Sequence, residues 1–106
     1  MMADMLGVAG MEIRNIRHKG LKAFVERGQT KGLPAAYVEK LRDIMTFLLD
    51  MEEIGEVFDL KKYKPHRLAG DRAGTFSLSV TPNWRVTFGY DAAANELIDL
   101  DYEDYH

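Results

Sequence analysis

The chain has 106 residues, a length that fits a single domain. It contains no cysteine, which excludes disulfide bonds and thiolate metal sites and suits a reducing cytosol. Its three histidines (His18, His66 and His106) match no compact zinc motif, so we expect neither a metal nor another cofactor. No apolar run approaches the roughly 18 residues of a membrane span, so we expect a cytoplasmic protein without membrane contact.

The formal net charge is −3, but basic residues gather in two stretches. Residues 12–31 hold six lysines and arginines against two glutamates. Residues 61–72 hold one acid, Asp71, and five basic residues: Lys61, Lys62, Lys64, Arg67 and Arg72. A polyanion can bind along such stretches, although they can equally be ordinary solvated surface.

The first ten residues are small and apolar but lack the basic start of a signal peptide. Met11 is a second plausible start of translation, so the choice between Met1 and Met11 stays open. We expect residues 1–10 to be a disordered extension and residues 11–106 to form one domain.

Two helices are predicted in the first half of the chain, after a short strand over residues 12–17. The first helix covers about residues 19–27, because apolar residues recur at helical spacing and Gly28 is a typical C-cap. Pro34 suits the first turn of the second helix. Its apolar stripe advances by steps of four, three, four and three residues: Tyr37, Leu41, Ile44, Leu48 and Met51.

Three strands are predicted in the second half, over residues 75–81, 84–90 and 96–102. Apolar residues alternate with polar ones in each strand, which indicates a sheet with one apolar face. That face consists of Phe76, Leu78 and Val80, then Trp84, Val86, Phe88 and Tyr90, and finally Ile98, Leu100 and Tyr102. Helices followed by strands predict an α+β fold, with two N-terminal helices packed on a small antiparallel sheet.

Arg85 lies in the middle of a strand on the polar face of this sheet, with Ser77, Ser79 and Thr87. A guanidinium held there can bind a phosphate through two hydrogen bonds and stabilise charge in a transition state. The alternative is a surface arginine on a solvated sheet.

His66 and the C-terminus offer acid–base groups. The basic neighbours of His66 lower its proton affinity, so it can act as a base near neutral pH; alternatively it is a loop histidine without a partner. Asp104 and His106 are two residues apart, so a continued strand places both on one side, where the carboxylate can orient the imidazole. The alternative is a frayed terminus. These residues make a nuclease a reasonable hypothesis.

Three segments together resemble the HigB-type toxins of the RelE superfamily, also described as plasmid-maintenance killer proteins. They are IRHKGLKAFVERG, HRLAGDRAGTFSLSVTPNWRVTF and the terminal DYEDYH. The resemblance covers residues 11–106 and implies a RelE-like α+β fold of the microbial ribonuclease type. It also implies a growth-arresting endoribonuclease that cuts mRNA in the A site of the 70S ribosome. A HigA-like helix-turn-helix antitoxin would neutralise it, and operator DNA would be bound only through the antitoxin complex.

By position, the resemblance implies that His66, Arg85, Asp104, Tyr105 and His106 are catalytic. Arg85 would hold the phosphate, the two histidines would transfer protons, Asp104 would orient or share that task, and Tyr105 would stack on a base. Which histidine is the acid stays open. The expected phosphate-binding residues are Lys61, Lys62, Lys64, Arg67 and Arg72.

Two positions depart from the family pattern. Ala69 stands where relatives often have lysine, which removes a phosphate contact that Lys64 and Arg67 can replace. Phe76 stands where relatives often have tryptophan, a change that concerns packing. Two other functions stay open: a weak or inactive toxin-like module that binds an antitoxin and contributes to operon repression, and a relative that acts on free RNA or another target. Codon preference, the antitoxin and the oligomeric state are not determined by the sequence.

Overall fold

The apolar faces of two helices and of a five-stranded sheet meet in one core. The computed structural model describes residues 10–105. The strands are β1 (Glu12–Ile13), β2 (His66–Arg67), β3 (Phe76–Ser79), β4 (Trp84–Asp91) and β5 (Glu96–Asp104). The helices are α1 (Lys19–Arg27) and α2 (Val38–Asp50), with 3₁₀ helices at Ala35–Tyr37, Ile54–Asp59, Lys61–Tyr63 and Gly70–Arg72.

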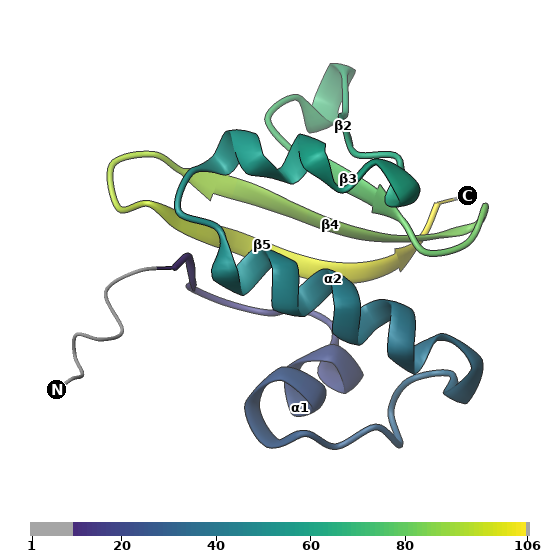
Figure 1. Cartoon of the computed structure of the whole chain (residues 1–106). Coiled ribbons are helices and arrows are strands. Elements are labelled where there is room, and N and C mark those ends of the chain that lie inside the picture. Colours follow the sequence, from purple (N-terminus) through teal and green to yellow (C-terminus); the bar gives the residue numbers. More distant parts are fainter. Residues whose placement is uncertain (1–9, 106) are drawn as a thin grey trace, which may run out of the picture.

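The sheet has the order β1-β5-β4-β3-β2. β2, β3, β4 and β5 pair antiparallel, whereas β1 joins the edge of β5 in parallel and extends through an isolated bridge between Ile16 and Leu100. The helices cover one face of this sheet (Figure 1). The α+β fold predicted from the sequence is therefore confirmed, and its first strand lies on a parallel edge.

The helix ends follow from local chemistry. The α1 helix begins after His18, whose Nδ1 accepts a hydrogen bond from the Leu21 amide at 3.0 Å. It ends at Gly28, which adopts a left-handed φ of 72° as expected of a C-cap glycine. The α2 helix begins at Val38, later than predicted, because the residues after Pro34 form a 3₁₀ turn first. Among the described residues, no helix is long and apolar enough to span a membrane.

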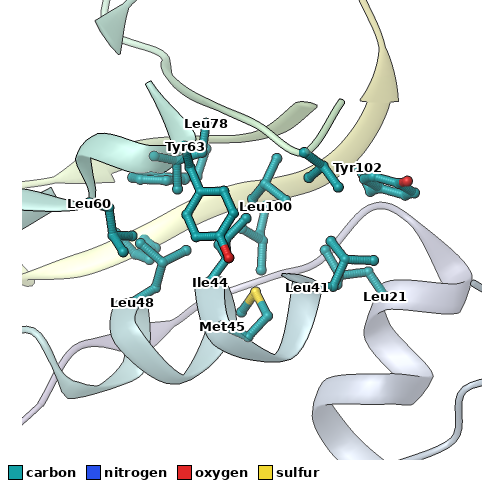
Figure 2. Packing of buried hydrophobic residues seen from close by; sticks show 14 of the residues in the cluster. Leu21, Leu41, Ile44, Met45, Leu48, Leu60, Tyr63, Leu78, Leu100 and Tyr102 are labelled. Atoms are coloured by element: carbon teal, nitrogen blue, oxygen red, sulfur yellow. The ribbon is translucent and has the colours of Figure 1, made fainter. Parts of the chain in front are cut away.

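The core lies between α2 and the sheet. Leu41, Ile44 and Leu48 of α2 are fully buried, and Figure 2 shows them beside Leu78 of β3 and Leu100 of β5. The predicted stripe of the second helix is therefore the face that packs on the sheet. Since α2 covers this face, the polar residues of the strands remain on the other one.

The β5 strand departs from strict alternation. Its pairing with β4 is regular up to Thr87 and slips before Gly89, at the place where Asp99 adopts a positive φ of 52°. Leu100 keeps the alternation of Tyr102, whereas the slip turns Leu97 into the core and leaves Ile98 half-buried beside Gly89. The expectation that Ile98 points into the core was therefore wrong, because a bulge changes the face in the middle of a strand.

Gly20 allows α1 to contact the following loop, and we expect Gly20→Ala to destabilise the fold. A Cβ there would overlap the carbonyl group of Gly32. The overlap should lower the free energy of unfolding by about 1–3 kcal/mol, despite the better helix propensity of alanine. Urea unfolding measures the effect.

Gly55→Ala is the matched control, because a Cβ there meets nothing within 4 Å. We expect this variant to have the wild-type free energy of unfolding or one that is higher by about 0.4–1 kcal/mol, so its urea midpoint should not fall. Equal stabilities of the two variants would contradict the packing role of Gly20.

Candidate functional site

The face of the sheet that the helices leave open carries polar residues in two rows. Residues paired across neighbouring strands project to the same face, as do residues two positions apart in one strand. One row consists of Ser79, Arg85 and Glu103, and the other of His66, Ser77, Thr87 and Asp101, of which Ser77 and Thr87 are buried. Arg85 therefore has a hydroxyl group on one flank and a carboxylate on the other.

Arg85 is held in place by an aromatic ring, but its positive charge has no carboxylate partner among the described residues. Its guanidinium carbon lies 4.0 Å from the centre of the Tyr105 ring, a cation–π contact. Its Nε is buried and has no hydrogen-bond partner in the described part of the chain. None of the ion pairs between described residues includes Arg85. A positioned guanidinium without a carboxylate partner is suited to bind an anion.

A groove of about 360 Å³ adjoins Arg85 at the end of β3. Two lysines of the second basic stretch, Lys62 and Lys64, line it, together with Ser79, Val80, Thr81 and Pro82. Lys62 also forms an ion pair with Asp43 at 3.1 Å, so its charge is shared. The groove places three cations and two hydroxyl groups where a phosphodiester backbone can lie.

A second hollow of about 630 Å³ is lined by Tyr105, a residue that is 53% exposed. The wall includes Ala69 and Arg72, along with Leu68, Glu103 and Asp104. An exposed ring beside a hollow of this size can stack on a nucleobase. Ala69 adds no charge there.

His66 lies on the same face as Arg85, with β3 between them. Its Nδ1 is 3.1 Å from the Lys64 carbonyl oxygen. Because a carbonyl oxygen only accepts, Nδ1 must carry the proton in this contact, and in a neutral ring Nε2 is then the basic nitrogen. The ring is exposed, so Nε2 can accept a proton from a ligand.

Of the three C-terminal residues predicted to be catalytic, the structure places one, Tyr105, beside Arg85. Tyr105 contacts Arg85, whereas Asp104 pairs with Trp84, so alternation assigns its side chain to the opposite face. His106 lies outside the described residues, and so does the predicted pairing of its ring with Asp104.

The expected phosphate-binding residues divide into three groups. Lys62 and Lys64 line the groove beside Arg85, and Lys61 is exposed on the same 3₁₀ helix. Arg67 pairs with Phe76 on the helix-covered side, and its guanidinium lies 5.2 Å from the Phe76 ring centre. Arg72 forms an ion pair within the chain.

That ion pair involves Glu103, a residue that the sequence reasoning missed. Arg72 donates from both terminal nitrogens to the two Glu103 oxygens, at 2.9 and 2.8 Å, and the Thr87 hydroxyl also donates to Glu103. The bonds from Arg72, followed by the one from Thr87, keep the pKa of Glu103 below its usual range despite partial burial. Strand alternation could have identified Glu103 from the sequence, because it places the Glu103 side chain, and not that of Asp104, on the same face of the sheet as Arg85.

Comparison with known proteins shows which family this chain is similar to. Residues 14–106 match the family described as the RelE-like toxin of the type II toxin–antitoxin system HigB. Endoribonuclease HigB of Proteus vulgaris is 42% identical over 94 residues, which cover 89% of this chain and 99% of that protein. A solved structure, the YoeB/ParE toxin from Agrobacterium tumefaciens, aligns over 89% of this chain and 94% of its own, with 19% identity and a TM-score of 0.48.

The ion pair of Glu103 predicts a dependence of stability on pH. Because the folded-state pKa is lowered, the pair stabilises the fold above the unfolded-state pKa of about 4.3, and this contribution is lost as the pH falls through the folded-state pKa. Asp43 and Asp91 have lowered pKa values as well, so Glu103→Gln should reduce the acid-induced loss of stability without abolishing it.

Urea unfolding at pH values from about 6 to 3 measures this effect. Arg72→Gln should flatten the profile less than Glu103→Gln does, because the Glu103 carboxylate keeps the bond from Thr87 and lies opposite Arg85 in the neighbouring strand. A wild-type profile in both variants would contradict the assignment.

Proposed function

Because the chain belongs to the HigB-like family of RelE-type toxins from type II toxin–antitoxin systems, we propose that it is an endoribonuclease that cuts messenger RNA. The family implies an antitoxin partner and an RNA substrate. The observation that carries the proposal is the Arg85 guanidinium, which lies on an open polar face beside a lysine-lined groove and has no carboxylate partner among the described residues.

The cleavage needs a base, a phosphate ligand and an acid. In this proposal Nε2 of His66 takes the proton of a ribose 2′-hydroxyl, whose oxygen attacks the adjacent phosphorus. The bond from phosphorus to the 5′-oxygen breaks, and the leaving oxygen receives a proton from His106. Asp104, which borders the hollow beside Tyr105, assists this transfer. Arg85 stabilises the charge on the phosphoryl oxygens, and Tyr105 stacks on a base. The products are a 2′,3′-cyclic phosphate and a 5′-hydroxyl end.

The biological setting is also part of this proposal. The substrate is mRNA in the A site of the 70S ribosome, in the cytoplasm, and a HigA-like helix-turn-helix antitoxin neutralises the enzyme. Operator DNA is bound only through the toxin–antitoxin complex. The domain that does this comprises residues 11–106, of which residues 14–106 match the family.

One observation favours a second candidate function. Ala69 lines the hollow beside Tyr105 and contributes no charge where relatives often have lysine. A toxin-like module with weak or absent cleavage, which binds the antitoxin and contributes to operon repression, is the alternative. Cleavage measurements separate the two functions.

We expect expression of the full chain to arrest bacterial growth and to create new 5′ ends in cellular mRNA. Arg85→Ala and His66→Ala should abolish both effects, with a loss of cleavage of about 100-fold or more for Arg85→Ala, since that change removes charge stabilisation at the phosphate. Growth curves and mapping of mRNA 5′ ends are the measurements.

Arg27→Ala is the control, because it removes one exposed positive charge on α1. It should remain fully toxic. Normal growth and no new mRNA ends, with folded wild-type protein present, would support the alternative function.

Lys64 should contribute to binding more than to chemistry. We expect Lys64→Ala to raise the KM for mRNA on 70S ribosomes by about 3- to 10-fold with little change in kcat, because it removes one contact to the RNA backbone. The slope of log(kcat/KM) against log(salt) should fall by about one unit. Lys19→Ala on α1 is the matched control, and an equal effect of both changes would argue against the groove as the RNA path.

A further inference from the structure

Glu103 is placed where it would be expected to neutralise Arg85. The two residues are directly paired across β4 and β5, and side chains in such positions have Cβ atoms about 5 Å apart. Opposite charges at this spacing attract each other. Yet both Glu103 oxygens bind Arg72, and the Arg85 guanidinium lies on the Tyr105 ring instead.

Arg72 reaches Glu103 from a loop of defined shape. The 3₁₀ turn Gly70–Arg72 joins β2 to β3, and it begins at Gly70, which has a φ of 66°. The Ala73 amide donates to the Gly70 carbonyl at 3.1 Å, and the Thr75 amide donates to the Arg72 carbonyl at 3.0 Å. These backbone bonds fix the shape of the loop, and the Arg72 side chain reaches from it to Glu103 of β5.

The charges explain what this contact achieves. Arg72, Glu103 and Arg85 together carry one net positive charge. Without Arg72, the remaining pair of Glu103 and Arg85 carries none, and the carboxylate can occupy the donors that a phosphate would use. A second cation that binds the carboxylate therefore leaves the Arg85 donors available to an anion.

We propose that Arg72 is a positioning residue, which binds Glu103 so that the Arg85 guanidinium stays available for the RNA phosphate. The inference rests on the proposed role of Arg85. It replaces the direct phosphate contact that the sequence suggested for Arg72 with an indirect one. Glu103 takes no part in the chemistry, and its charge is an obstacle that Arg72 removes.

Three purified variants test this: Arg72→Gln, Glu103→Gln and the double variant. The assay is cleavage of mRNA on 70S ribosomes. Arg72→Gln should lose about 10- to 100-fold in kcat/KM, because Glu103 then pairs with Arg85. Glu103→Gln should remain within about 3-fold of wild type. The double variant should also return to within about 3-fold of wild type, because no carboxylate remains to occupy Arg85.

Two outcomes would overturn the proposal. A double variant as slow as Arg72→Gln would mean that Arg72 contacts the RNA itself. Equal losses in the two single variants would mean that the ion pair matters only for the fold, or that Glu103 takes part in the reaction. Neither outcome allows rescue by the second substitution.

A second measurement is independent of cleavage. The NMR signal of the Arg85 Nε–H group, assigned with Arg85→Lys, reports on the contacts of the guanidinium. It should shift in Arg72→Gln and return to the wild-type position in the double variant. An unchanged signal in Arg72→Gln would overturn the proposal even if the chain cut no RNA, whereas absent cleavage by wild type with the expected shifts would contradict only the proposed function.

Discussion

The pairing of β4 with β5 is the constraint on which the rest of the structure depends. Each residue pair along this ladder serves one of the two faces of the sheet. Val86 and Tyr102 form a pair that is buried against the helices, and the adjoining pair, Arg85 and Glu103, belongs to the open face. Core packing therefore fixes the register, and the register places the charged residues of the candidate site.

The net negative charge of the chain is compatible with an RNA substrate because of where the charges lie. In the first basic stretch, Arg14 binds Asp91 and Glu96, and Arg17 lies 3.5 Å from Asp99. These ion pairs attach the N-terminal segment to the β5 side of the sheet. Acidic residues thus pair with Arg14 and Arg17 away from the groove, whereas Lys64 and Arg85 beside it form no ion pair among the described residues and Lys62 shares its charge with Asp43.

Much of the architecture was predictable because it depends on short-range patterns. The helical stripe of α2, the C-cap at Gly28 and the alternation of β3 and β4 each follow from neighbouring residues, and the structure confirms them. The bulge in β5 was not predictable in this way. Asn15, far away in sequence, donates from its side chain to the Asp99 carboxylate and accepts from the Asp99 amide, and this contact holds the positive φ of Asp99.

The sequence by itself determined the fold class, the position of Arg85 on a polar face and the resemblance to a toxin family, since periodicity and motif order need no long-range contact. Only the tertiary structure decided which charges are available. In the folded chain Arg72 binds Glu103, Arg67 lies against the Phe76 ring, and Arg85 lies on the Tyr105 ring without a carboxylate partner among the described residues. The Arg72–Glu103 partners are 31 positions apart in the chain, and their meeting depends on strand register and loop shape, which local sequence does not encode.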